Sequence, residues 1–184
     1  GSGNNGIYGE NNFIITIQDN TFNMPDNPAD RHIGVYLKNN NTTGLENLPE
    51  ENEPAPNFRM FLIHNTFNNG TVSAMLMNYT SSYLPFYVKS NTLNSSCACG
   101  IVGRNMTGSI KDNIISLTGA LIPMGIHLIT SSPDIYNNVI NTENVSLHTV
   151  YSSYPNLAPV VSGTSLSWTG GKNRLTSLNS DNIQ

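Results

Sequence analysis

Several polar residues occupy alternate positions of short, strand-like segments and have side chains suited to recognising a sugar. They are Tyr36, Lys38, Asn78, Arg104, His127 and Tyr151. Tyrosine rings pack against the apolar faces of sugars, and Lys, Arg and His donate hydrogen bonds to hydroxyls or carboxylates. In a catalytic protein, His127 would be a general base and Arg104 an electrostatic stabiliser. The alternative is that both are ordinary outward-facing polar residues.

This group of residues contains no carboxylate. Glycoside hydrolysis generally needs two carboxyl groups at a set separation, and calcium binding needs a cluster of oxygen ligands. No His and acidic residues have metal-ligand spacing, so we expect neither a metal nor a cofactor. Acidic side chains could still come from two irregular stretches, through Asp26, Asp30 or the segment from Glu46 to Glu53. The residues favour a binding surface over an active site.

The composition predicts a neutral, polar surface. Charged residues make up 11% of the 184 residues and the formal net charge is −4, whereas the usual charged share is about 25%. Asparagine occurs 29 times, and Ser and Thr together occur 35 times. Because the chain has no basic patch, we expect no nucleic-acid partner. Because no apolar run reaches about 18 residues, we expect no membrane insertion.

A short pattern centred on asparagine recurs along the chain: an apolar residue, two spacers, Asn, one spacer and an apolar residue. Its asparagines are Asn20, Asn65, Asn91, Asn113 and Asn138. The first step is 45 residues, which suggests one coil swollen by an insertion, and the others are 26, 22 and 25 residues. A second pattern, a small residue followed by alternating apolar positions, falls between the copies. Two patterns that keep step predict a stack of equivalent turns.

Strand geometry converts this repeat into a coil. Alternating apolar residues are typical of strands, and Asn, Gly and Ser are typical of turns. If each turn advances by about 4.8 Å, the spacing of hydrogen-bonded strands, the inward side chains of successive turns stack on one another. The repeated asparagines then form a column whose amides hydrogen-bond along the axis. Asn itself is expected to adopt the left-handed backbone conformation at the bend.

Aligning the small-residue pattern predicts which side chains face inward. With Ala74 placed beside Gly34, Gly100 and Gly125, Met75 and Met77 belong to the core, and Leu76 and Asn78 to the outer face. Another column is formed by the residues that precede the repeated asparagines. In that column, His64 is expected to lie out of contact with Asp19 and Asp112, with a coil between them.

On these motifs, residues 14–175 resemble the right-handed parallel β-helix repeats of the pectin-lyase-like superfamily. We predict an all-β, single-stranded right-handed parallel β-helix of about six coils, with loop insertions at about residues 23–31 and 39–57. Residues 1–3 are interpreted as a tag remnant, and residues 4–184 as one domain taken from a longer protein. Cys97 and Cys99 are too close in sequence for an easy disulfide, so we expect two free, packed thiols.

The superfamily includes polysaccharide lyases and hydrolases, phage tailspikes and bacterial adhesins, so the resemblance implies a fold more than an activity. The leading hypothesis is a non-catalytic, extracellular or cell-surface module that binds a polysaccharide or cell-surface glycan, like an adhesin or a tailspike. One alternative is a polysaccharide lyase or glycoside hydrolase that acts on the outer strand face. The other is a structural β-helix that associates side by side as a homo-oligomer.

Overall fold

The computed structural model describes most of the chain between residues 5 and 173. The described residues are 5–11, 14–25, 31–39, 59–79, 84–95, 99–118, 124–131, 133–152, 161–162 and 165–173, and side chains are described up to residue 141 except at Ser95. The expected loop insertions at about 23–31 and 39–57 lie largely outside these residues, and Cys97 lies wholly outside them.

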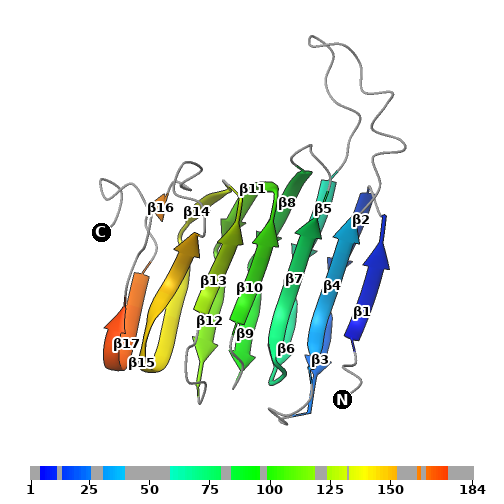
Figure 1. Ribbon diagram of the computed structural model, residues 1–184. Coiled ribbons are helices and arrows are strands. Elements are labelled where there is room, and N and C mark those ends of the chain that lie inside the picture. Colours follow the sequence, from blue (N-terminus) through cyan, green and yellow to red (C-terminus); the bar gives the residue numbers. More distant parts are fainter. Residues whose placement is uncertain are drawn as a thin grey trace.

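Three parallel sheets, which we name A, B and C, surround one core (Figure 1). Sheet A contains β1 (Asn5–Glu10), β4 (Ile33–Asn39), β7 (Val72–Asn78), β10 (Cys99–Arg104), β13 (Met124–Ile129) and the last part of β15 (Val139–Ser152). Sheet B contains β2 (Ile14–Gln18), β5 (Arg59–Ile63), β8 (Leu84–Lys89), β11 (Met106–Lys111), β14 (Asp134–Tyr136) and β16 (Val161–Ser162). Sheet C contains β3 (Thr21–Asn23), β6 (Thr66–Asn68), β9 (Thr92–Ser95), β12 (Ile114–Leu117), the first part of β15 and β17 (Ser165–Asn173).

Each turn passes through sheets A, B and C in that order, and every strand pairs in parallel with its equivalents in the neighbouring turns. The winding is right-handed, with the strands of sheet A side by side from β1 to β15 (Figure 1). The predicted class, an all-β right-handed parallel β-helix, is confirmed. About four turns, β1 to β12, are complete. This is slightly fewer than the six coils expected, and the strands β13 to β17 continue the parallel pairing beyond these four turns.

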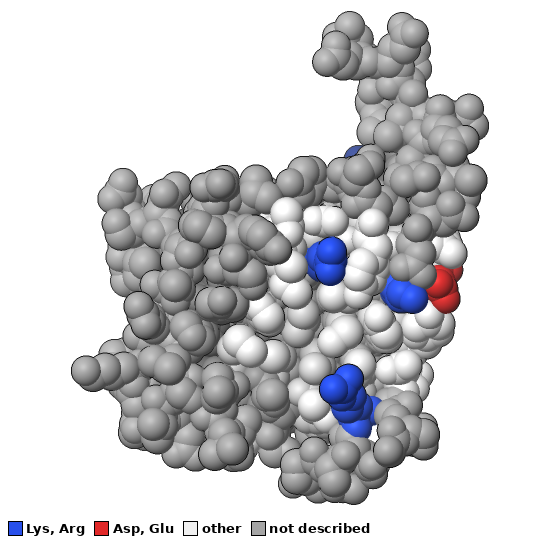
Figure 2. Space-filling model, viewed as in Figure 1, with Lys and Arg blue, Asp and Glu red and all other residues white. Residues whose placement is uncertain are grey.

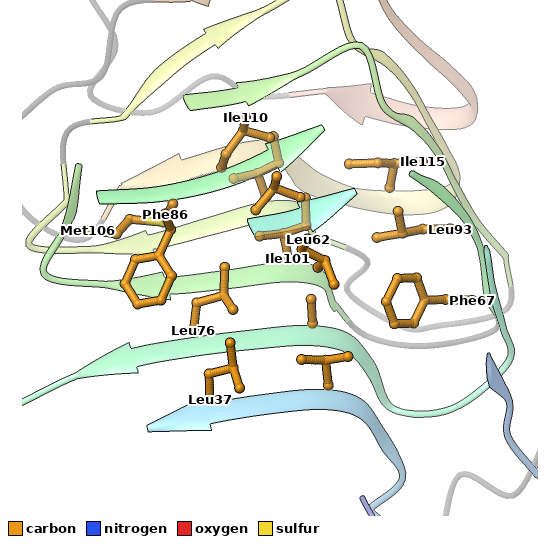
Figure 3. Close-up of a cluster of buried hydrophobic side chains, with 14 of the residues drawn as sticks. Leu37, Leu62, Phe67, Leu76, Phe86, Leu93, Ile101, Met106, Ile110 and Ile115 are labelled. Carbon is orange, nitrogen blue, oxygen red and sulfur yellow. The ribbon is translucent and has the colours of Figure 1, made fainter. Parts of the chain in front are cut away.

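The core consists of inward side chains stacked in rows. Phe67, Leu93 and Ile115 from sheet C lie one above another and face the aliphatic side chains of sheets A and B (Figure 3). All three are at most 1% exposed. Fully burying a side chain of this size is worth about 1.5–3 kcal/mol, so each turn adds a similar increment of stability from the same positions.

The repeated asparagines form the predicted column, at the corner between sheets B and C. Each amide donates from Nδ2 to the Oδ1 of the next asparagine along the axis, over 2.9 to 3.1 Å, through Asn20, Asn65, Asn91, Asn113 and Asn138. The same Oδ1 atoms also accept the backbone N–H of the preceding asparagine. Because the last four amides are 1% exposed, the column is a buried network whose polar groups satisfy one another.

The left-handed backbone conformation is found one residue earlier than expected. The residues with positive φ at this corner are Asp19, His64, Ser90, Asp112 and Asn137, with φ between 53° and 57°. The repeated asparagines themselves are absent from the positive-φ residues of the described chain. The predicted position of the bend was wrong, because the bend and the buried amide belong to two neighbouring residues. The first residue bends the backbone, and the asparagine fills the bend with its amide.

The small residue that begins each strand of sheet A is required by close packing. A Cβ atom on Gly34 would lie 2.5 Å from the Phe67 ring, and one on Gly100 would lie 2.6 Å from the carbonyl oxygen of Gly125. In β7, however, Val35 pairs with Ala74 and Leu37 pairs with Leu76. The small residue aligned with Gly34 is therefore Ser73, and the predicted alignment of residues 74–78 was shifted by one position.

This shift reverses every side chain of β7. Leu76, which was predicted on the outer face, lies in the core at 1% exposure. Met75 and Met77 belong to the outward columns, in register with Val102 and Arg104. A one-residue slip in a strand moves all its side chains to the opposite face, and the two adjacent small residues in β7 allowed either alignment.

Candidate binding faces of the solenoid

The outer face of sheet A, on which the predicted site residues were placed, is mostly uncharged. Lys and Arg side chains stand apart from one another on it, and an acidic patch lies beside one of them (Figure 2). The strand register forms two outward columns. The first contains Tyr8, Tyr36, Met75, Val102 and His127, and the second contains Glu10, Lys38, Met77, Arg104 and Ile129.

Three tyrosines and one arginine form a cluster on this face, which we call the tyrosine–arginine cluster. The rings of Tyr8 and Tyr36 meet edge to face, with centroids 5.5 Å apart. The guanidinium carbon of Arg104 lies 4.6 Å from the centre of the Tyr79 ring, within the range of a cation–π contact. Burial raises the pKa of Tyr36, and the charge of Tyr79 and a hydrogen bond with it raise that pKa further. Tyr36 and Tyr79 are therefore close enough to interact, so the Tyr8–Tyr36 pair and the Tyr79–Arg104 pair belong to one cluster.

Arg104 has unused hydrogen-bonding capacity. Its Nε is buried and has no hydrogen-bond partner, and the guanidinium forms no ion pair with any residue that the structure describes. A buried donor without a partner costs roughly 1–3 kcal/mol. Lys38, by contrast, lies 3.8 Å from a carboxylate oxygen of Glu10, and the hydroxyl of Tyr8 donates to the other oxygen over 2.7 Å. On this face, Lys38 is thus paired with a carboxylate, whereas Arg104 forms no ion pair with a described residue and lies over the Tyr79 ring.

The predicted site residues are only partly brought together. Tyr36, Lys38 and Arg104 share the outer face of β4 and β10. His127 shares the face but pairs with Val102, so it is two residues along the strand from the position beside Arg104. Tyr151 pairs with His127 through the backbone, and its side chain is outside the described part.

Asn78 is a correction to the predicted site. It pairs with Asn39 and is fully buried, with 0% exposure, so it is not part of the outer face. Its Nδ2 lies 3.4 Å from the carbonyl oxygen of Asn105 at the corner between sheets A and B. The one-residue shift in β7 explains the error. Tyr8 and Tyr79 were missed because the alignment began at Gly34 and ended at the last residue of each strand.

Beneath the cluster, the outer face of sheet A is apolar. Val72, Met77, Cys99 and Val102 are between 6% and 8% exposed and form a second hydrophobic cluster outside the main core. Cys99 is a buried thiol within this cluster. Of the apolar outward residues expected on this face, Val102 and Ile129 are confirmed and Leu76 was wrong.

The outer face of sheet B has a different composition, and no site residue was predicted on it. One outward column contains Thr16, Phe61, Tyr87, Ser109 and Asp134, and its neighbour contains Gln18, Ile63, Lys89, Lys111 and Tyr136. The Phe61 and Tyr87 rings are stacked, 5.1 Å apart with an interplanar angle of 18°. The Nζ of Lys111 lies 5.3 Å from the centre of the Tyr136 ring.

A signal for this face was present in the sequence. Phe61 and Tyr87 both lie four residues before a repeated asparagine, and Lys89 and Lys111 both lie two residues before one. Because the asparagines align in the column, residues at a constant distance before them must align as well. The motif therefore fixes the register of sheet B more firmly than the small-residue pattern fixes that of sheet A.

The outer face of sheet C carries small polar and β-branched residues. One column contains Thr21, Thr66, Thr92, Ile114 and Val139, and the other contains Asn23, Asn68, Asn94, Ser116 and Asn141. Neither column contains a charged or aromatic residue in the described part. In its described part, this face therefore lacks the aromatic and charged side chains that bind a sugar ring most strongly.

His64 and Asp19 are in contact, contrary to the expectation that a coil separates them. The Nδ1 of His64 lies 3.6 Å from an Oδ1 of Asp19, with both side chains more than half exposed. The reason is that the 45-residue step is a single turn, since β2 pairs directly with β5. Among the described residues, no three His, Cys, Asp or Glu side chains gather as a metal site. No helix long and apolar enough to cross a membrane occurs there either.

No protein-family pattern, curated protein or solved structure matches this chain. The class that is shown is therefore the parallel β-solenoid itself, with its asparagine column.

Proposed function

We propose that this solenoid is a non-catalytic module that binds a carbohydrate through the outer face of sheet A. The observation that supports this most directly is the tyrosine–arginine cluster, which places aromatic rings beside a guanidinium that forms no ion pair with a described residue. Sugars offer apolar ring faces and hydroxyl groups, and such a cluster complements both.

The site is built on a rigid frame, which favours binding. Tyr36 and Arg104 project from strands that are hydrogen-bonded on both sides, in the middle of sheet A. Side chains held on strands lose little further freedom when a ligand binds, so more of the contact energy is available as affinity.

The wider setting is part of the same proposal. We infer an extracellular or cell-surface location, an adhesin-like or tailspike-like role and membership of the pectin-lyase-like superfamily. The resemblance in the asparagine motif and the Gly-led strands supports these inferences. A neutral surface rich in Asn, Ser and Thr agrees with them, because it limits nonspecific attraction to charged polymers.

The test is glycan binding by the protein and by Tyr79→Ala, measured by titration calorimetry against neutral and uronic-acid polysaccharides. We expect Tyr79→Ala to raise the dissociation constant about fivefold, the range of a lost aromatic contact. Ile114→Ala on sheet C is the matched control, because Ile114 and Tyr79 are 48% and 43% exposed. Equal affinity of the two variants, or release of unsaturated or reducing ends by the protein, would overturn the proposal.

A further inference from the structure

The outer face of sheet B places two like charges side by side with no ion-pair partner among the described residues. Lys89 and Lys111 are direct partners in the register of β8 and β11, and both side chains point outward and are half-buried. Like charges at directly opposed positions of neighbouring strands repel one another. In the part of the chain that the structure describes, neither ammonium group forms an ion pair.

An aromatic ring with one free face lies beside this lysine pair. Tyr87 precedes Lys89 by two residues on the same face of β8, and its ring stacks on Phe61 from the preceding turn. On the other side, the position in the following turn is Ser109, which has no ring. That face of Tyr87 therefore borders a small side chain and can accept a flat, partly apolar group.

We propose that these residues form a second binding site, on sheet B, for an anionic saccharide. Its sugar ring packs against Tyr87 above Ser109, and its anionic group lies between Lys89 and Lys111. Residues two apart on a strand are separated by about 6.6 Å, which is the scale of one sugar ring with an anionic substituent. The anion neutralises the repulsion between the two ammonium groups.

The neighbouring charges limit the extent of the site. Arg59, exposed at the start of β5, adds a third cation on this face in the second turn. Asp134, which follows Ser109 in the outward column, brings negative charge to the following turn, and the charge of Asp112, directly after Lys111, helps to raise the pKa of that lysine. An anion is therefore favoured over β8 and β11 and disfavoured over β14.

The contact with Tyr136 positions one of the two lysines, because the Nζ of Lys111 lies 5.3 Å from the centre of the Tyr136 ring. Hydrogen bonding to Tyr136 is the first cause of the raised pKa of Lys111, although burial lowers it. The ammonium group is thus held on the phenol at the edge of the site and remains charged at neutral pH. An anion bound between the lysines would meet one ammonium that is already placed.

The test measures binding of polygalacturonate, its methyl ester, dextran sulfate and inorganic polyphosphate at fixed ionic strength. We expect binding of both anionic polysaccharides and weak binding of the neutral ester, which has the same backbone. The double variant Lys89→Gln/Lys111→Gln should lower the affinity about tenfold or more, because hydrogen bonds to charged groups are strong. Arg31→Gln, which removes an exposed charge elsewhere, is the matched control and should change the affinity little.

A second variant separates sugar recognition from simple charge attraction. Tyr87→Ala keeps both lysines and should weaken polygalacturonate but not polyphosphate, because only the saccharide has a ring to pack. Because Tyr79 lies on sheet A, adding Tyr79→Ala should not change the loss of affinity caused by Lys89→Gln/Lys111→Gln. Equal losses in the double variant and Arg31→Gln would overturn the proposal, as would polyphosphate binding as tightly as the polysaccharides. Preference for one polysaccharide anion over the other would identify carboxylate or sulfate as the group recognised.

Discussion

On the outer face of sheet A, Lys38 forms an ion pair with Glu10, and Arg104 lies over the Tyr79 ring. The surface around these residues is largely apolar. On the outer face of sheet B, Lys89 and Lys111 stand next to one another with no carboxylate partner in the described residues. Both faces belong to the same turns and have the same parallel backbone pairing. The difference arises only from the outward residues of each strand.

In this fold, one set of residues determines the winding of the chain and another set determines the chemistry of the outer faces. Inward side chains and the asparagine column determine the winding, whereas outward positions can change without altering it, because alternate residues of a strand face opposite sides. Two faces of one solenoid can therefore be suited to different ligands.

The largest effect is expected when the frame common to both faces is broken at the asparagine column. Asn113→Ala removes the oxygen that accepts from both the backbone N–H and the Nδ2 of Asn91, and it removes the donor to the carbonyl of Val88. Each buried group left unpaired costs roughly 1–3 kcal/mol. We expect the free energy of unfolding to fall by about 3 kcal/mol or more, as measured by chemical denaturation.

Amide hydrogen exchange in the same variant distinguishes the two faces. The column lies at the corner between sheets B and C, so protection should be lost first in β11 and β12 and last in β10 of sheet A. Asn94→Ala, an exposed position on sheet C, is the control and should change stability by less than about 0.5 kcal/mol. A loss of stability as small as that of the control would show that the buried amides are not a structural necessity.

A smaller effect on stability is expected when a cation of either face is replaced by methionine, and its size should differ between the two faces. Replacing Arg104 by Met removes a buried, unpartnered Nε, which is worth roughly 1–3 kcal/mol, but also removes a cation–π contact of about 0.5–1 kcal/mol. We expect Arg104→Met to raise the free energy of unfolding by up to about 2.5 kcal/mol, the difference between these two terms. It should also weaken carbohydrate binding on sheet A. Calorimetric melting and glycan titration measure the two changes.

Lys89→Met is the matched substitution on sheet B. Removing one of two opposed like charges should stabilise the sheet by a few tenths of a kcal/mol, within about 0.2–1 kcal/mol for such pairs. If Arg104→Met were destabilising, the guanidinium of Arg104 would be a structural residue. The contrast between the two faces would then be lost.

Much of the frame could be predicted from the sequence, because the asparagine motif has few alternatives. An apolar residue three positions before and two positions after each asparagine ties Asn91 and Asn113 to the core on both sides, so the column and the register of sheets B and C follow. The register of β7 could not be predicted in the same way. Ser73 and Ala74 are both small enough to lie against the core, and only the pairing of Ala74 with Val35 decides between the two alignments.

The candidate sites were less predictable than the frame. Tyr36 and Arg104 were found because they lie within a repeated strand, but Tyr79 follows its strand and reaches the face only through the path of its side chain. The stack of Phe61 on Tyr87 joins residues that are far apart in sequence. Its geometry depends on ring rotation, which no spacing rule determines.

The smallest expected effect tests how free the cations of sheet B are. The hydrogen bond with Tyr136 raises the pKa of Lys111 above the ordinary value of 10.5, and the charges of Tyr136 and Asp112 add to this against the opposing effect of burial. A group whose pKa is higher in the folded state than in the unfolded state contributes its full stabilisation at pH values below the unfolded-state pKa. That contribution is lost as the pH rises through the folded pKa, so it disappears only in the alkaline range.

Tyr136→Phe should therefore return the pKa of Lys111 towards 10.5, as measured by NMR titration of the lysine side chain. Tyr87→Phe removes a phenol from the same face without touching the hydrogen bond to Lys111, and it should leave that pKa unchanged. An unchanged pKa in Tyr136→Phe would mean that the phenol does not hold the ammonium group. The Lys111 ammonium group would then be no more restrained than that of Lys89. The two ammonium groups could approach one another more closely, and their mutual repulsion on sheet B would be larger.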